Sequence, residues 1–78
     1  MEAFQERVVA EQRELGEKID KLKAFIMESP TFKTLPVAEQ QRLNRQCDAM
    51  LEYFNILGER ITAFGFSPRV GAVGGFQS

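Results

Sequence analysis

Hydrophobic residues recur every three or four positions through the second half of the chain, which predicts a long amphipathic helix. The recurring positions, called the seam below, are Leu43, Cys47, Met50, Phe54, Leu57, Ile61 and Phe64. This spacing keeps the apolar side chains on one side of an α-helix. Leu51, Tyr53 and Ile56 lie off the seam and widen its apolar surface. We therefore expect this helix to contact more than one neighbouring helix.

A first helix is predicted over residues 4 to 28. Its apolar stripe consists of Val8, Leu15, Ile19, Leu22 and Ile26. Three further apolar residues flank the stripe: Phe4, Val9 and Phe25. Gln12 lies within this stripe and interrupts its apolar series. Gly16 in this helix and Gly58 in the other each cost about 1 kcal/mol relative to alanine, and the pair indicates places where the helices come close.

The two helices are separated by a proline-containing connection. Ser29 and Pro30 predict the end of the first helix, because proline disfavours helical backbone at the residue before it. Ser29 can cap a short new turn that has Pro30 at its first position. Phe32 and Leu35 are expected to close the end of the core. Pro36 pre-sets the first turn of the second helix, residues 36–64, roughly 40 Å long. So short a connection predicts an antiparallel helical hairpin.

Gly65 predicts the end of the second helix, because glycine at the first non-helical position favours a left-handed cap. Phe66 can fold back against Ile61, as often happens next to such a cap. The chain is thus expected to divide into a helical hairpin domain, residues 1–64, and a Gly-rich C-terminal tail, residues 65–78. The tail is either disordered or packed along a neighbouring subunit.

The length of the chain makes an oligomer the expected state. Seventy-eight residues form one small domain whose burial on folding is marginal. Disulfides, metals or oligomerisation usually supply the missing stability. Cys47 is the only cysteine and there is no histidine, so neither an internal disulfide nor a structural zinc site can form. We expect an all-α antiparallel hairpin that assembles into a compact homo-oligomer, without metal or cofactor.

The charge balance argues against binding to duplex nucleic acid. The formal net charge is −1, from ten basic and eleven acidic residues, whereas a duplex requires several phosphate contacts from one basic face. A small phosphorylated ligand needs only a few converging cations. No apolar run approaches the roughly 20 residues of a membrane span, and no segment resembles a signal peptide. We expect a soluble intracellular protein that does not bind membranes.

No catalytic constellation is recognisable in the sequence. Without histidine there is no ordinary Ser–His or Cys–His pair, and no glycine-rich loop follows a strand. The carboxylates lie on charged, solvated helix faces, where nothing tunes their acidity for catalysis. We therefore expect that the protein is not an enzyme.

Each helix has a flank that combines aromatic and charged or polar residues. On the first helix these are Phe4, Glu11, Lys18 and Phe25; on the second they are Gln46, Tyr53 and Arg60, with Thr62 nearby. Aromatic rings can stack on nucleobases, and Lys or Arg can bind phosphate. In the alternative interpretation, which spacing alone favours, the aromatic residues pack against other subunits and the cations reach into water.

A set of residues spread over both helices carries a family resemblance. In the first helix they are Arg7-Val8-Val9, Glu14-Leu15, Lys18-Ile19, Leu22 and Phe25-Ile26. Further along they are Phe32, Leu35, Glu39-Gln40, Arg42-Leu43, Gln46, Met50, Tyr53, Leu57 and Glu59-Arg60-Ile61. With this pattern, residues 4 to 64 resemble the phage anti-CBASS cyclic-nucleotide sponge family, and the hairpin is similar to the helical part of a phage anti-Thoeris sponge.

The resemblance implies a compact homohexamer that sequesters cyclic oligonucleotide second messengers without cleaving them. Such a protein would block CBASS-type immune signalling in the host bacterial cytoplasm. The resemblance implies cyclic dinucleotide sites between paired first helices, where the nearest residues are Phe4 and Lys18, with Lys21 as the alternative cation. It also implies a separate cyclic trinucleotide site near a threefold axis, where Arg60 is expected to bind, assisted by Thr62.

A second hypothesis needs no small ligand. In it the protein is a structural or interaction protein, a helical oligomer that docks a helix of a partner protein into an apolar groove. The two hypotheses differ in whether the purified protein binds a cyclic nucleotide.

Overall fold

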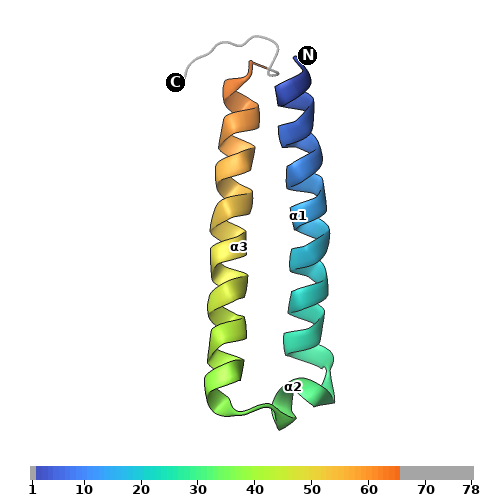
Figure 1. The fold of residues 1–78 in the computed structure, drawn as a ribbon, viewed down its shortest axis with the longest axis vertical. Helices are drawn as coiled ribbons and strands as arrows, with labels where there is room; N and C mark the ends of the chain where they lie inside the picture. The colour runs from blue at the N-terminus through green and yellow to red at the C-terminus, as the bar shows by residue number, and fades with distance from the viewer. Residues whose placement is uncertain (1, 66–78) are drawn as a thin grey trace.

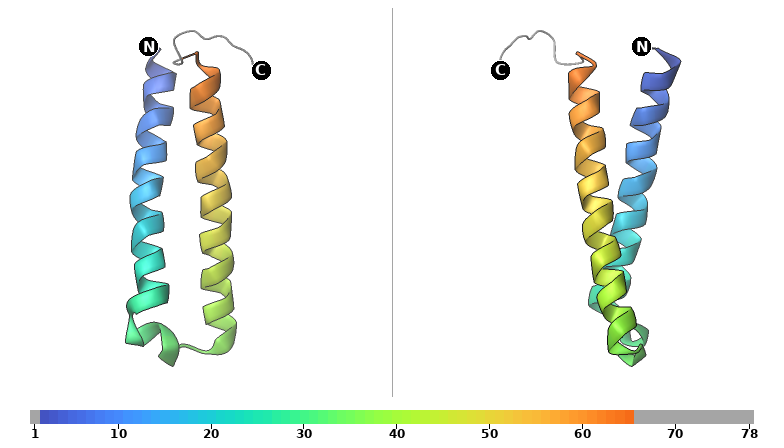
Figure 2. Two further views of the ribbon diagram at one scale, coloured as in Figure 1. Left: turned by 180° about the vertical axis from the view of Figure 1, so that it is seen from behind. Right: turned by 60° about the vertical axis from the view of Figure 1, so that its left-hand side comes forward.

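The computed structural model describes residues 2–65 and contains two long helices joined by a short one (Figure 1). Helix α1 spans Ala3–Glu28, α2 spans Pro30–Thr34 and α3 spans Val37–Ala63. Helices α1 and α3 run antiparallel and side by side, and the other viewing directions in Figure 2 show the same arrangement. The predicted all-α hairpin is confirmed, and the predicted helix limits agree with the observed ones to within one residue.

One narrow core lies between α1 and α3. Its buried cluster consists of Val8, Leu15, Ile19 and Leu57. Five partly buried residues pack against this cluster: Met50, Leu51, Phe54, Ile61 and Phe64. Every member of the predicted seam and of the first-helix stripe is buried or half-buried, which confirms both patterns. The core remains incompletely covered, because each long helix shields only one side of the other.

Helix α3 is also apolar on a side that α1 does not cover. Tyr53 is 43% exposed and Ile56 is 44% exposed. Leu51, the third off-seam residue, is half-buried against the core. The outer side of α3 therefore presents two large apolar side chains to its surroundings. Among residues 2–65, neither long helix combines the length and hydrophobicity that crossing a membrane requires.

The connection between the long helices is stabilised by a cap and a ring contact. The Oγ of Ser29 accepts a hydrogen bond of 3.2 Å from the backbone N–H of Thr31, and Pro30 occupies the first position of α2. Phe32 is buried, and its ring meets that of Phe25 edge-on with centroids 6.0 Å apart. The predicted Ser29 cap and the closure of the core by Phe32 are both confirmed.

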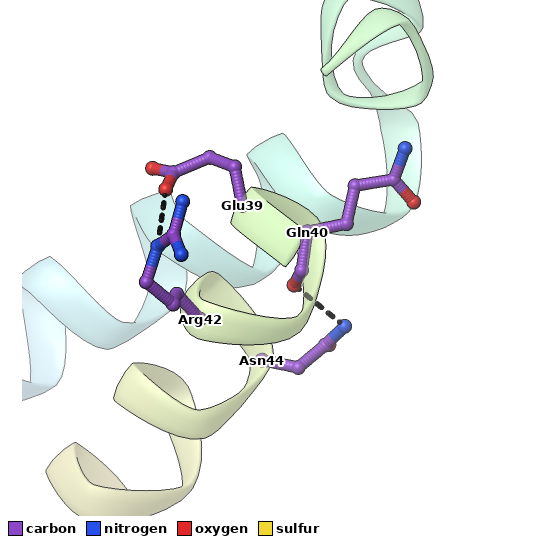
Figure 3. Close-up of polar contacts among 4 residues, drawn as sticks. All are labelled: Glu39, Gln40, Arg42 and Asn44. Atoms are coloured by element: carbon purple, nitrogen blue, oxygen red, sulfur yellow. Dashed lines mark hydrogen bonds and ion pairs between the residues drawn. The ribbon is translucent and has the colours of Figure 1, made fainter. Parts of the chain in front are cut away.

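Gln40 ties the start of α3 to this connection. Its Nε2 donates to the backbone oxygen of Leu35 at 2.9 Å and to that of Lys33 at 3.4 Å. Its own backbone oxygen accepts from Nδ2 of Asn44 at 3.1 Å (Figure 3). Pro36, predicted within the first turn, is the residue that caps α3. One side chain thus binds carbonyl groups that the end of α2 leaves without helical partners.

The opposite end of the hairpin is closed by an aromatic pair. The rings of Phe4 and Phe64 are T-shaped, with centroids 5.6 Å apart, and this geometry is a favoured one for aromatic pairs. Gly65 follows with a φ of 84°, which confirms the predicted left-handed cap. The contact predicted for Phe66, and the tail beyond it, lie outside the described residues.

The two glycines of the long helices face side chains from the opposite helix. A Cβ on Gly16 would lie 3.1 Å from Cε2 of Phe54, and one on Gly58 would lie 3.0 Å from Nε2 of Gln12. A side chain of the opposite helix, and not its backbone, thus fills the space beside each glycine, and the predicted close approach of the helices themselves stays a prediction. Gln12 is half-buried, and its Nε2 donates to the backbone oxygen of Phe54 at 3.4 Å.

Candidate functional site

The residues predicted for the cyclic dinucleotide site all lie on α1. Phe4 is 48% exposed although its ring meets Phe64, so part of the ring remains accessible. Lys18 and Lys21 are exposed, and neither forms an ion pair with another residue of the range 2–65. Phe4 and Lys18 are roughly 21 Å apart along the axis at 1.5 Å per residue. Within one chain the structure does not bring this aromatic ring and this cation together.

The residues predicted for the trinucleotide site lie on different sides of α3. Arg60 and Thr62 are both exposed, but residues two positions apart project roughly 160° apart around a helix. Arg60 lies on the same side as the exposed Tyr53 and Ile56. Thr62 belongs to a different part of the surface. A single chain therefore cannot direct both side chains at one small ligand.

Thr62 lines a shallow hollow near the end of α3. The lining residues are Asn55, Gly58, Glu59 and Thr62. Asn55 and Glu59 lie four positions apart, as do Gly58 and Thr62, which places all four residues on one side of the helix. The sequence prediction included Thr62 but missed Asn55 and Glu59. The same three-and-four spacing that identified the seam was the signal that could have found them.

A second hollow lies where the two long helices meet. Its lining residues are Gly16, Ile19, Asp20, Lys23, Leu51 and Phe54. The cation here is Lys23, which the sequence prediction did not select, and Asp20 supplies a neighbouring opposite charge. Lys18 and Lys21 do not contribute to this hollow. The absence of a side chain at Gly16 leaves room for the ring of Phe54.

A third hollow lies on the first half of α3, lined by Arg42, Arg45, Gln46 and Ala49. The guanidinium of Arg42 is held by Glu39, with Nε and Oε1 2.8 Å apart (Figure 3). Gln46, predicted to share a flank with Tyr53 and Arg60, lies roughly 21 Å from Arg60 along the helix axis. That flank is thus a long stripe and not one compact site.

These surfaces carry charged, polar and aromatic side chains. Within residues 2–65, no group of three or more His, Cys, Asp and Glu side chains could hold a metal ion. Cys47 is a free thiol that is only 8% exposed, as expected for a small buried hydrophobic residue. The exposed groups are ammonium, guanidinium, amide, carboxylate and aromatic side chains.

Comparison with known protein families shows to which family the chain belongs. The model of the family described as Sequestin matches residues 2–63 of the 78 residues. A search of curated proteins and a search of solved structures each gave no significant match. The matched range begins at the residue before α1 and ends at the last residue of α3, so it includes both long helices and their connection. The chain belongs to the Sequestin family.

Proposed function

We propose that the protein is a phage-encoded sponge that binds cyclic oligonucleotide second messengers without cleaving them. By sequestering cyclic dinucleotides and cyclic trinucleotides, it would block CBASS-type immune signalling in the cytoplasm of the host bacterium. The observation that carries this proposal is the Sequestin match along the whole hairpin. The family name is consistent with sequestration of a small molecule or a partner. The resemblance to cyclic-nucleotide sponges supplies the class of ligand.

The proposed functional unit is a homohexamer. The exposed apolar side chains that support assembly are Phe4, Val37, Tyr53 and Ile56. Burying apolar surface stabilises an assembly by about 25 cal/mol per Å², and a single hairpin of this size has little stability of its own. Symmetry also repeats every cation in each subunit. A chain with a net charge of −1 can in this way concentrate positive charge where subunits meet.

The proposed dinucleotide site joins two α1 helices. In one chain Phe4 and Lys18 are roughly 21 Å apart along the helix axis. When a second α1 runs antiparallel to the first, Phe4 of one subunit lies beside Lys18 of the other. A base stacks on the accessible part of Phe4, and the ammonium group of Lys18 meets a phosphate. Lys21 projects roughly 60° from Lys18 and is the second candidate for that phosphate.

The proposed trinucleotide site uses Arg60 from three subunits. Arg60 lies on the side of α3 that carries Tyr53 and Ile56, both exposed in the single chain. If this apolar side packs around a threefold axis, three guanidinium groups converge there. A cyclic trinucleotide carries three phosphates, so the symmetry of the ligand equals that of the site. Thr62, on another side of the same helix, contributes to such a site only from a neighbouring subunit.

Calorimetry with purified protein tests the proposal. The protein is titrated with cyclic GMP–AMP and with cyclic triadenylate, then heat-denatured, and the released ligand is analysed by mass spectrometry. Binding followed by recovery of unaltered ligand is the expected result. A cleaved ligand would instead identify an enzyme. Failure to bind any cyclic nucleotide would overturn the proposal and favour the interaction protein that docks a partner helix.

A further inference from the structure

The hollow lined by Asn55, Gly58, Glu59 and Thr62 has three polar side chains and no cation among its lining residues. Its side chains supply one amide, one carboxylate and one hydroxyl. A carboxylate repels phosphate, so this hollow is unsuited to the phosphate group of a nucleotide although Thr62 lies in it. The same groups match the hydrogen-bonding edge of a nucleobase, which offers neutral donors and acceptors.

We propose that this hollow recognises a guanine base of the bound cyclic oligonucleotide; the inference rests on the proposed function. An ionised carboxylate is an acceptor with two oxygens, and guanine presents two adjacent donors, N1–H and N2–H. Glu59 accepts both donors as a fork. Adenine offers a single amino group on the corresponding edge. One carboxylate oxygen of Glu59 would then receive no hydrogen bond from the base.

Asn55 completes the recognition of guanine. It lies four positions before Glu59, and side chains at that spacing are neighbours on a helix surface, roughly 5–6 Å apart at Cβ. The amide nitrogen of Asn55 donates to O6 of guanine, next to the donors that Glu59 accepts. The hydroxyl of Thr62, which both donates and accepts, is a further neutral group of the hollow.

Gln12 of α1 lies next to one lining residue of this hollow. Its Nε2 would lie 3.0 Å from a Cβ on Gly58, which is one of the lining residues. Within the described part of the chain, the hydrogen bond recorded for this side chain is the 3.4 Å contact from Nε2 to the backbone oxygen of Phe54. A polar residue in an apolar stripe, such as Gln12 in α1, and a glycine in the middle of a helix, such as Gly58 in α3, both weaken a hairpin. Here they meet beside the proposed base site.

The position of Arg60 fits the same ligand. Consecutive residues on a helix project roughly 100° apart, so the guanidinium of Arg60 lies on the side of α3 next to Glu59. The base edge and the phosphate of a nucleotide lie at opposite ends of the nucleotide unit. Glu59 and Arg60 therefore suit the two ends of one nucleotide unit, an acceptor for the base and a cation for the phosphate.

The test compares two ligands that differ by one amino group. Cyclic AMP–AMP–GMP and its inosine counterpart, cyclic AMP–AMP–IMP, are identical except for the N2 amine of guanine. We expect the guanine ligand to bind at least about tenfold more tightly, since a hydrogen bond to a charged group is worth about that factor. In Glu59→Gln the preference should disappear, and in Asn55→Ala both ligands should bind less tightly. The control Glu14→Gln, at an exposed position of α1, should behave as wild type.

Each outcome decides the inference. Equal affinity of wild type for the two ligands, or a preference that persists in Glu59→Gln, would overturn it while the sponge function stands. Binding of cyclic triadenylate without binding of the guanine ligand would have the same meaning. Failure of wild type to bind cyclic triadenylate, cyclic GMP–AMP and the guanine ligand would overturn both proposals. Circular dichroism melts establish that the variants are folded.

Discussion

The side-chain amide of Gln12 packs against Gly58, close enough that a Cβ on Gly58 would come within 3.0 Å of its Nε2. The amide is the far end of a flexible side chain, so it can move aside at small cost. The corresponding contact at Gly16 is different, because the neighbour is a ring carbon of Phe54. Phe54 packs against the core, so a shift of its ring disturbs core contacts.

The substitution Gly58→Ala should therefore stabilise the protein. Alanine is favoured over glycine in a helix by about 1 kcal/mol, and the displaced amide loses only the 3.4 Å hydrogen bond to Phe54. We expect the free energy of unfolding to rise by about 0.5–1 kcal/mol. Urea denaturation at a fixed protein concentration measures this change in the free energy of unfolding. A lower free energy of unfolding in Gly58→Ala would show that the Gln12 side chain cannot move aside.

The same change at Gly16 should have the opposite sign. Its Cβ would meet the Phe54 ring at 3.1 Å, and overpacking of a core typically costs about 1–3 kcal/mol. This exceeds the helix-propensity gain of about 1 kcal/mol. We expect Gly16→Ala to lower the free energy of unfolding by about 1 kcal/mol in the same urea experiment. Equal stabilisation by both alanines would mean that the Phe54 ring adapts freely.

The exposed apolar side of α3 should be an assembly contact. Placing a charge there with Ile56→Lys should shift the protein towards monomers, because a charge is costly to bury without a partner. Multi-angle light scattering at micromolar concentration measures the mass. The matched control is Met27→Lys, since Met27 is 78% exposed at the end of α1. A wild-type protein that is already a folded monomer would contradict the assembly itself.

Lys18 should contribute to binding of cyclic dinucleotides. Lys18→Ala is expected to weaken the affinity for cyclic GMP–AMP by about tenfold, the usual worth of a charge-assisted contact. Lys33→Ala removes an equal charge from the exposed surface of α2 and should leave this affinity unchanged. If Lys21→Ala and not Lys18→Ala has the effect, the alternative cation is the correct one.

Arg60 should act on the other class of ligand. Arg60→Ala is expected to weaken binding of cyclic triadenylate by more than tenfold, because symmetry removes the guanidinium from every subunit at the site. Arg45→Ala, an exposed arginine earlier on α3, is the control. Calorimetry on variants with the parent oligomeric mass gives both numbers. Parent affinity in such an Arg60 variant would refute this assignment.

Local sequence patterns predicted most of the fold. The seam, the Ser29 cap and the Gly65 cap each depend on residues close together in the chain, and helical periodicity with proline and glycine chemistry is enough to place them. The contact between Phe4 and Phe64 was not predicted. It depends on the register of two antiparallel helices, which the conformation of the connection sets.

The candidate site was less predictable than the fold. That Arg60 and Thr62 diverge follows from the helix period and could have been deduced. That Asn55 and Glu59 share one side of α3 also follows from their spacing, but only the structure shows that this side is left uncovered. The proposed pairing of Phe4 with Lys18 needs a second chain, so no feature of one hairpin fixes it.

The ring contact between Phe4 and Phe64, at the end of the hairpin away from the connection, would link ligand affinity to local unfolding. In the proposed site a base stacks on the part of Phe4 that Phe64 leaves accessible. The T-shaped contact with Phe64 fixes the orientation of the Phe4 ring for that stacking, so the proposed binding-competent conformation is the one with the aromatic pair formed. Apparent affinity is scaled by the fraction of chains in that conformation. By reciprocity, a bound nucleotide must also protect the last turn of α3 from opening. Amide exchange in residues 60–64 would then report occupancy of a site on the other helix.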